Sequence, residues 1–451
     1  MRTRIAPALA LALAFSACQP TPAPPEVQCE PGQRWIVRAD VSALVEEAPV
    51  VVDLSEIGFK VVCLDKPSVM TAESQGAEPG RDIIVRIPED ESATVWTAPE
   101  AEATIQSEPL ESQMWGMAKV QARPGLSAHD GKGATIVIID TGVDCEHPDL
   151  QADCSLFKDY VPEDPAHHWH GTHVAGTAAA LANNGIGGLS SGSRATILDA
   201  RVLDRSGSGY MSNVARAILD ASFPRWTLNL SLGSNQLDSV ITDAVAYAVD
   251  HGAVVVAAAG NGNSDQPSYP GCTPRAIGVG ATTPSDQRAS FSNFGACVDL
   301  AAPGTDILST TPDGAYSLAS GTSMASPHVA GVVAAMMAAG VNPGEVLARL
   351  RASADNGPSN LGGKRLNALR ALSDAGQPAP PTEVQPTAGP TSTRPSPYPG
   401  LPTSTTPIIP TATASPAPTV RPTATPIVQC SKVGLCEYRT GGRRLCGPCG
   451  Q

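Results

Sequence analysis

The chain has 451 residues, of which 42% are hydrophobic and 16% charged, with 43 acidic residues against 30 basic ones. This length suggests two or three structural units rather than one small core. The formal net charge of −13, without a stripe of Lys and Arg that could neutralise phosphates, argues against nucleic acid as a partner.

An export signal opens the chain. Two arginines precede an apolar run over residues 5–17, which is too short to span a bilayer but suits the hydrophobic part of a signal peptide. The sequence Phe-Ser-Ala-Cys at 15–18 resembles the lipobox of bacterial lipoproteins, in which Cys18 would be lipidated and become the mature N-terminus. Ordinary signal-peptidase cleavage near Ala14 is the alternative. Both interpretations of residues 1–18 predict an exported protein, secreted or bound to the cell envelope through a lipid on Cys18.

Two regions of different composition follow. Residues 19–110 are acidic and contain strand-like pieces such as 34–38 and 82–87, which predict a small α+β region. In residues 111–373, short β-branched runs such as 134–139 alternate with Ala-rich helical stretches. Near-continuous apolar strands that alternate with helices predict an α/β fold, namely a doubly wound, mostly parallel sheet with helices on both faces.

The C-terminal part is rich in proline and cysteine. Residues 374–428 are dominated by Pro, Thr, Ser and Ala, so they cannot bury enough apolar surface to fold and are predicted to form an extended linker. The tail, residues 429–451, holds four cysteines that allow three disulfide pairings. A disulfide-bonded binding module, an inert terminus and a zinc site built on Cys446 and Cys449 all remain open for it.

The cysteine count agrees with export. Setting Cys18 aside leaves ten of the 11 cysteines, and outside the tail they fall into local groups. In an oxidising compartment such grouping suggests local disulfides. The groups are Cys29 with Cys63, Cys145 with Cys154, and Cys272 with Cys297.

Three short motifs in residues 111–373 carry side chains that could perform chemistry. Asp140 ends a buried strand, which is where open α/β sheets place functional groups. His170 begins the segment His-Gly-Thr-His-Val-Ala-Gly, which leads into a helix of small residues. Ser323 lies just before a helix whose first turn tolerates Pro327, because the first helical N–H groups have no partners within the helix.

These three residue types together predict acyl transfer. A serine hydroxyl is a weak nucleophile until an imidazole accepts its proton, and the imidazole needs a buried carboxylate that fixes its tautomer. The N-terminus of the helix after Ser323 adds partial positive charge where an oxyanion would develop.

Other classes of protein account for the motifs less well. Asp-Thr-Gly also occurs in aspartic proteases, but these need paired carboxylates, and the tripeptide occurs once here. The α/β-hydrolase order requires a histidine well beyond the serine, whereas the last histidine is His328. The histidine cluster at 167–173 lacks the Glu of the His-Glu-x-x-His zinc motif. A binding or scaffold protein without turnover is the remaining alternative.

The chain order Asp, His, Ser is that of subtilisin, and residues 111–373 resemble the subtilase family of serine peptidases, most closely its proteinase K branch. The resemblance implies a subtilisin-like fold and identifies Asp140, His170 and Ser323 as the catalytic triad of an endopeptidase. It also implies that the amide of Asn261, in the segment Ala-Ala-Ala-Gly-Asn, donates to the oxyanion beside the backbone N–H of Ser323. No cofactor is expected for catalysis, and a monomer is expected.

The resemblance further implies a cleft for peptides. Two segments would clamp an extended peptide by strand addition, in which backbone hydrogen bonds hold any sequence and pockets set the preference. An apolar floor of the P1 pocket predicts broad specificity with a preference for bulky apolar residues. The implied substrate-binding residues are Gly207, Ser208, Gly209, Tyr210, Ser231, Leu232, Gly233, Ala258 and Gly260.

Two expectations about regulation and stability come from the family alone. Residues 19–110 occupy the position of an inhibitory propeptide, so a zymogen is expected, with cleavage somewhere in residues 98–113. A structural calcium ion would be held by the carboxylate of Asp299 and the carbonyls of Pro274 and Ala276. The alternative for Asp299 is a surface acid at the end of a strand.

Details around the triad complete the expectations. The pair Cys272 and Cys297 matches a disulfide of the same branch, and a bond between Cys145 and Cys154 would staple the loop after Asp140. Trp169 departs from the family, whose members carry Gly or Ser before the catalytic histidine. Its ring is expected either to close a rim of the cleft or to pack outward.

Overall fold

A computed structural model describes residues 29, 33–38, 48–64, 68–70, 80–87, 93–95, 108–162, 168–375, 436–440 and 443–447. The chain divides into two compact units, Met1–Thr382 and Glu383–Gln451. The predicted signal segment with Cys18 and almost all of the predicted linker lie outside the described residues.

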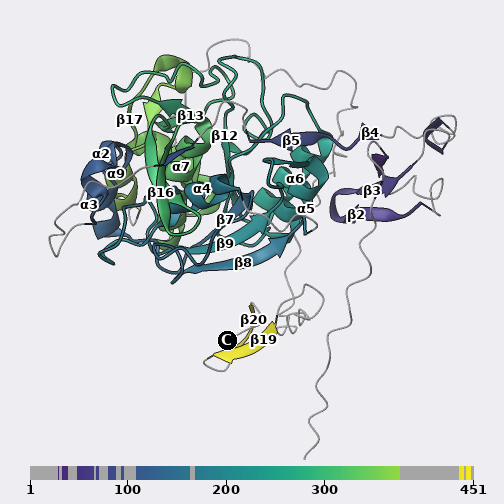
Figure 1. The fold of residues 1–451 in the computed structure, drawn as a ribbon, viewed down its shortest axis with the longest axis horizontal. Coiled ribbons are helices and arrows are strands. Elements are labelled where there is room, and N and C mark those ends of the chain that lie inside the picture. The colour runs from purple at the N-terminus through teal and green to yellow at the C-terminus, as the bar shows by residue number, and fades with distance from the viewer. Residues whose placement is uncertain are drawn as a thin grey trace, which may run out of the picture. The chain divides into compact units, whose positions relative to one another are not determined.

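A nine-stranded sheet forms the centre of the first unit (Figure 1). Neighbouring strands of this sheet run parallel, with one exception. The two strands at one edge, which are named first in the next sentence, run antiparallel. In spatial order the strands are β17 (Asp355–Asn356), β18 (Lys364–Arg365), β14 (Leu300–Pro303), β13 (Ile277–Thr282), β12 (Val254–Ala258), β11 (Trp226–Leu230), β7 (Thr135–Asp140), β9 (Thr196–Arg201) and β8 (Cys154–Asp159).

Helices cover both faces of this sheet. Because side chains alternate along a strand, β7 sends Ile136 and Ile138 to one face and Val137 and Ile139 to the other. The first face packs against α4 (Trp169–Ala179) and α7 (Thr322–Ala338), and the second against α5 (Met211–Asp220) and α6 (Ser239–Asp250). The predicted α/β architecture is therefore confirmed.

Helix α7 runs through the interior of this unit. Its residues from Thr322 to Met337 are all buried, so it is apolar on every side rather than amphipathic. It approaches α4 closely at Gly331, where a Cβ atom would lie 2.4 Å from the carbonyl oxygen of Ala178. Glycine is required there because any side chain would push the two helices apart.

Shorter elements complete the α/β region. The antiparallel hairpin of β15 (Ile307–Thr311) and β16 (Ala315–Ala319) leads into the N-terminus of α7. The remaining helices are α2 (Trp115–Lys119), α3 (Ala122–Ala128), α8 (Val346–Ser353), α9 (Ala368–Ser373), and the 3-10 turns η3 (Glu111–Gln113), η4 (Pro343–Glu345) and η5 (Ser359–Leu361).

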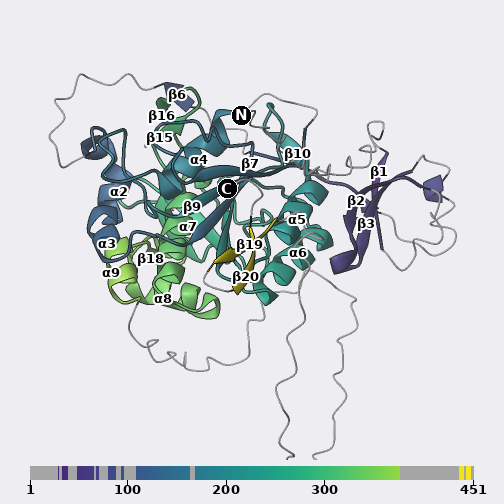
Figure 2. The same ribbon diagram turned by 90° about the horizontal axis from the view of Figure 1, so that it is seen from below.

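The N-terminal region forms a small antiparallel sheet beside α5 and α6 (Figure 2). Its order is β2 (Val50–Leu54), β3 (Phe59–Cys63), β1 (Arg34–Arg38) and β4 (Gly80–Arg81), with the 3-10 turn η2 (Ser55–Ile57) between β2 and β3. One face of it contributes Ile36, Phe59 and Val61 to the apolar cluster that contains α5 and α6.

Two short strands of the N-terminal region leave this small sheet and pair with the α/β region. Strand β5 (Ile84–Arg86) pairs with β10 (Ser208–Tyr210), and β6 (Ala93–Val95) pairs with β16. In the second unit, β19 (Cys436–Thr440) and β20 (Arg443–Gly447) form a hairpin. None of the helices in the described part of the chain has the length and apolarity needed to span a bilayer.

Candidate active site

The expected acid and base lie in direct contact. Asp140 is the last residue of β7, and His170 is the second residue of α4. The His170 Nδ1 atom lies 2.7 Å from Asp140 Oδ1, and both side chains are fully buried. The same carboxylate oxygen accepts a hydrogen bond from the Thr141 N–H at 2.7 Å. This contact fixes the orientation of the imidazole, as an acid–base pair requires.

A close approach of the backbone holds α4 against the end of β7. A Cβ atom at Gly171 would lie 2.2 Å from the carbonyl oxygen of Gly142, so only glycine permits this packing. The Gly171 N–H donates to Thr141 Oγ1 at 2.9 Å, and the Asp144 N–H donates to Thr172 Oγ1 at 2.9 Å. The first turn of α4 is thus bonded to the loop that follows Asp140.

The other side chains of the histidine motif have structural contacts. His173 Nε2 lies 3.0 Å from the Ile307 carbonyl oxygen, and burial lowers the pKa of His173 to about 3, so this ring stays neutral. The Trp169 ring packs edge-on, 5.4 Å from the His170 ring and 5.9 Å from the His173 ring. Trp169 is half-buried against the apolar cluster of α4, so outward packing does not describe it.

The expected nucleophile lies at the N-terminus of α7. Ser323 is fully buried, and its hydroxyl donates to the Ser231 carbonyl oxygen at 3.2 Å. In return the Ser231 hydroxyl donates to the Ser323 carbonyl oxygen at 2.9 Å. One of the two expected peptide-clamping segments is therefore bonded to the residue that would attack the peptide.

Asn261 is oriented by the neighbour of Ser323. Its Oδ1 atom accepts hydrogen bonds from the Thr322 N–H at 2.9 Å and from the Thr322 hydroxyl at 2.7 Å. The Gly260 N–H donates to the same hydroxyl at 3.1 Å. Because the oxygen end of the amide is held in this way, the nitrogen end is the one that faces away from Thr322 and can donate to a ligand.

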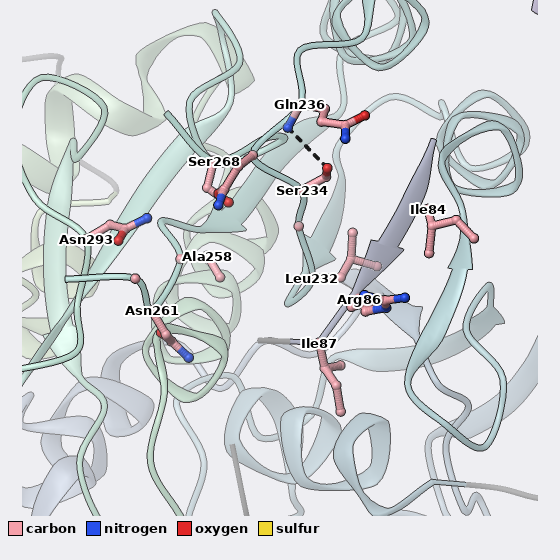
Figure 3. Close-up of a pocket in the computed structure, with 14 residues that line it drawn as sticks. Ile84, Arg86, Ile87, Leu232, Ser234, Gln236, Ala258, Asn261, Ser268 and Asn293 are labelled. Atoms are coloured by element: carbon pink, nitrogen blue, oxygen red, sulfur yellow. Dashed lines mark hydrogen bonds between the residues drawn. The ribbon is translucent and has the colours of Figure 1, made fainter. Parts of the chain in front are cut away.

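A cavity of about 480 Å³ lies beside Asn261 (Figure 3). Four of the expected substrate-binding residues line it, namely Leu232, Gly233, Ala258 and Gly260. Ser268 and Asn293 also line it, although the sequence did not single them out, because they come from loops far from the motifs. The Asn293 side chain donates to the Ala259 carbonyl oxygen at 2.9 Å, which fixes the loop beyond β12.

The clamp is occupied by a strand of the N-terminal region. Ile84, Val85 and Arg86 of β5 pair with Tyr210, Gly209 and Ser208 of β10. On the other side, the Arg86 N–H donates to Gly233 O at 3.2 Å and the Gly233 N–H donates to Arg86 O at 3.0 Å. The Ile87 N–H donates to Gly207 O at 3.0 Å.

Residues 84–87 are thus the middle strand between the two expected segments, and Figure 3 shows Arg86 and Ile87 opposite Leu232. The Val85 side chain is fully buried in the α5–α6 cluster. The sequence predicted both edges of this cleft, but it gave no sign of which segment would fill it.

A buried polar group joins the N-terminal region to α5. The Asp82 carboxylate accepts hydrogen bonds from the Ser212 N–H at 3.1 Å and the Ser212 hydroxyl at 2.6 Å. Arg34 Nε lies 2.9 Å from the same carboxylate, and its guanidinium lies 4.0 Å from the centre of the Tyr210 ring. Burial raises the pKa of Asp82, while the positive charge of Arg34 opposes that shift. The acid caps the first turn of α5.

The expected calcium ligands fit a cation poorly. Asp299 Oδ2 accepts a hydrogen bond from the Gly278 N–H at 3.0 Å, and its Oδ1 atom lies 3.9 Å from a guanidinium nitrogen of Arg351. A positive side chain beside the one carboxylate opposes a second positive charge. No group of three or more His, Cys, Asp or Glu with metal-site geometry occurs in the part of the chain that the structure describes.

A second set of oxygen atoms fits a hard cation better. Glu108 is buried with one carboxylate oxygen bonded to the Asn183 N–H and the other without a partner. Asp149 lies nearby and is bonded to the Asn184 amide at 2.8 Å and the Gly188 N–H at 3.2 Å. Burial raises the pKa of Asp149 to about 6, and the charge of Glu108 adds to this shift. Two buried carboxylates without a cation repel each other.

Three disulfides close within the first unit. They join Cys145 with Cys154, Cys272 with Cys297, and Cys29 with Cys63, whose Cα atoms are 5.2, 4.7 and 5.5 Å apart. The first joins the loop after Asp140 to the start of β8. These are the groupings that the sequence suggested, whereas the side chains of the tail cysteines lie outside the described residues.

Comparison with known proteins places this site in context. The sequence model described as "Subtilase family" matches residues 131–368. Thermitase from Thermoactinomyces vulgaris is 41% identical over 268 residues, which cover 58% of this chain and 96% of thermitase. Subtilisin Savinase from Lederbergia lenta is 39% identical over 264 residues, which cover 57% of this chain and 95% of that protein.

Two solved structures share the fold. A protease from Pseudoalteromonas arctica matches with a TM-score of 0.55 and 27% identity over 60% of this chain and 100% of its own. Fervidolysin from Fervidobacterium pennivorans, described as a keratinolytic enzyme related to subtilisin, matches with a TM-score of 0.66 over 78% of this chain and 62% of its own. At 24% identity the fervidolysin match speaks for the fold alone.

Proposed function

Since this chain belongs to the subtilase family and is a serine endopeptidase, we propose that it hydrolyses proteins through an acyl-enzyme on Ser323. The observation that carries the proposal is the buried 2.7 Å contact of His170 with Asp140. The same fold bonds Asn261 to Thr322, the residue before Ser323. The relatives described above are thermitase and a subtilisin, so the proteinase K branch stays a prediction.

The proposed reaction follows from the roles of these groups. Ser323 Oγ forms a bond to the carbonyl carbon of the scissile peptide while His170 Nε2 takes the hydroxyl proton. Asp140 accepts the hydrogen bond of His170 Nδ1 and stabilises the imidazolium. His170 then gives the proton to the leaving amine. A water molecule, deprotonated by the same imidazole, releases the acyl group and regenerates Ser323.

The oxyanion would be stabilised by two donors and a helix. These are the amide nitrogen of Asn261 and the backbone N–H of Ser323 in the first turn of α7. The positive end of the α7 dipole points at the same place. Donors that are already oriented cost no reorganisation when the charge develops, which is why they lower the barrier more than water does.

We infer that peptide substrates bind as β5 does, as the middle strand between Ser208–Tyr210 and Ser231–Gly233. Backbone pairing makes the binding tolerant of sequence. The small residues Ala258 and Gly260 leave room for a bulky apolar P1 side chain in the cavity beside Asn261. Broad specificity with an apolar P1 preference is therefore proposed.

We further propose that residues 19–110 are an inhibitory propeptide of an exported zymogen. Strand β5 occupies the groove that a substrate needs, and the Arg34–Asp82 pair fastens the same region to α5. An inhibitor that fills the substrate cleft keeps the enzyme inactive until it is removed. Export rests on the signal segment in the sequence, with lipidation of Cys18 as its envelope-bound form.

A structural calcium ion, if bound, would be held by Asp149 and Glu108 rather than by Asp299. One oxygen of Glu108 has no hydrogen-bond partner, and burial together with the charge of Glu108 raises the pKa of Asp149, so a cation beside the two acids would be stabilised. Ca²⁺ takes six to eight oxygen ligands, and carboxylates are its usual protein donors. It would neutralise the repulsion between the two acids and play no part in the reaction.

The test is labelling of the processed enzyme with a fluorophosphonate, which reacts with activated serines. Processed wild-type protein should be labelled, and Ser323→Ala protein, cut by added protease at the same place, should not. Ser320→Ala is the matched control, since that hydroxyl bonds to Asp306 and lies three residues from the nucleophile. Labelling of the Ser323→Ala variant would mean that another serine is the nucleophile, and absence of labelling in processed wild type would favour a binding protein without turnover.

A further inference from the structure

A second buried acid lies beside the catalytic pair on the neighbouring strand. In the register of β7 and β9, Asp199 is opposite Ile138 and Arg201 is opposite Asp140. Residues two apart on a strand face the same side, so Asp140 lies on the same face of the sheet as Ile138. Asp199 is opposite Ile138 and therefore shares this face, which packs against α4. The side chain of Asp199 is 3% exposed.

The contacts of Asp199 are few for a buried carboxyl group. One oxygen accepts a hydrogen bond from the Val143 N–H, and the Oδ1 atom is buried without a partner. The titratable and charged groups on the elements around it are Asp140 on β7, Asp159 at the end of β8, Arg201 on β9, His170 and His173 on α4, and Asp144 and Glu146 on the loop after β7.

Burial raises the pKa of Asp199 to about 7, and the negative charges of Asp159 and Asp140 act in the same direction. The Val143 N–H and the positive charge of Arg201 oppose this shift. Below that pH the group is a neutral carboxylic acid, which suits an oxygen that has no buried donor to stabilise its charge.

The hydrogen bond from Val143 connects Asp199 to His170 through a short mechanical path. Val143 follows Gly142, whose carbonyl oxygen is the atom that a side chain at Gly171 would strike. Gly171 is the residue after His170 in the first turn of α4. A shift of the Gly142–Val143 turn would therefore move the backbone that carries the imidazole.

On this basis we propose that Asp199 is a positioning residue for the His170–Asp140 pair, an inference that rests on the proposed function. In its neutral form it holds the Gly142–Val143 turn against α4. When it ionises, it adds a negative charge to the buried layer that contains His170. That charge favours the imidazolium, so the active, neutral form of His170 is reached only at higher pH.

Two substitutions separate the mechanical role from the electrostatic one. Asp199→Asn keeps an oxygen that can accept from Val143 but cannot ionise, whereas Asp199→Leu has the same number and branching of side-chain heavy atoms but no acceptor. We expect kcat of Asp199→Leu to fall about tenfold below that of Asp199→Asn, with KM less affected, because a small misplacement of reacting groups is costly. Equal kcat values in the two variants would overturn the positioning role.

The pH dependence supplies a measurement that packing alone cannot move. In the wild type, loss of the Asp199 proton near pH 7 should raise the pKa of His170. The midpoint of the acid limb of the kcat/KM profile should therefore lie about half a pH unit higher in the wild type than in Asp199→Asn. The same His170 shift should appear by NMR in full-length Ser323→Ala protein, which requires no turnover. An unchanged His170 pKa would overturn the inference, while failure of Ser323 labelling would count against the proposed function instead.

Discussion

The α/β region and the N-terminal region are built in different ways. In the α/β region, the side chains of the site are held by residues of the same region, such as Thr141, Thr322 and Ser231. The N-terminal sheet has a small cluster of its own, Val37, Val62, Leu64 and Val69, and places the apolar side chains of its other face in the cluster of α5 and α6.

This difference shows which region depends on the other. Small sheets bury too little surface to be stable alone, so the N-terminal region gains most of its stability from docking. The side chains of the proposed catalytic site are held within the α/β region, and the N-terminal region adds a strand to its cleft. Removal of the docked region should therefore uncover a site that is already formed.

The largest expected effect tests whether the α/β region is complete by itself. In processed enzyme, Asn261→Ala should lower kcat about 10²- to 10³-fold with little change in KM, because the amide donates chiefly in the transition state, as in subtilisin. Thr322→Val removes the hydroxyl that holds the Asn261 oxygen and should cause a smaller fall. Steady-state kinetics on one peptide substrate checks both, and a KM effect alone would assign Asn261 to substrate binding.

A second prediction tests the attachment of the N-terminal region. Arg34→Ala leaves the Asp82 carboxylate buried without its cation, and breaking a buried ion pair costs about 3–5 kcal/mol. The N-terminal region added in trans to processed enzyme should therefore inhibit at least about 10²-fold more weakly. Arg81→Ala is the control, because that exposed side chain packs on Trp35 within the same sheet. Equal losses in both variants would mean that the Asp82 contact does not hold the regions together.

The sequence predicted more of the α/β region than of the contacts made by the N-terminal region, and the reason is physical. The mostly parallel sheet, the helices on both faces and the candidate residues Asp140, His170 and Ser323 follow from local patterns and short motifs. The filling of the cleft by residues 84–87, and the meeting of Glu108 with Asp149, depend on tertiary contacts between distant segments. Single residues at such meetings carry no periodic signal, so they could not be predicted from one sequence.

A third prediction concerns how the docked strand resists cleavage. Arg86 pairs with Gly233 in an antiparallel bridge. If a peptide continued in the same register, the residue two positions after Arg86 would lie opposite Ser231. The carbonyl oxygen of Ser231 is 3.2 Å from Ser323 Oγ. The sequence has Pro88 at that point, outside the described residues. Proline has no N–H to donate to this oxygen, and one hydrogen bond is worth about 1 kcal/mol.

Pro88→Leu should therefore be cut after residue 88 at least about fivefold faster than the wild type, since Leu restores the N–H and also supplies an apolar P1 side chain. N-terminal sequencing of the products over time is the measurement, with the Pro88→Leu, Ser323→Ala double variant as the uncut control. A wild-type product that begins at Glu89 would show that this register is already the natural cleavage site, instead of residues 98–113.

A fourth prediction separates the two candidate calcium sites. If Asp149 and Glu108 hold the ion, EDTA should lower the Tm of processed enzyme by about 5–10 °C, because a ligand at 100 times its Kd adds about 2.7 kcal/mol. Asp149→Asn should abolish this response, and Asp299→Asn should retain it. Since protons compete with the ion for the Asp149 carboxylate, whose pKa is about 6 without the ion, the calcium-dependent part of the Tm should decrease progressively as the pH falls below that value. Loss of the response in Asp299→Asn alone would return the ion to the ligands Pro274, Ala276 and Asp299.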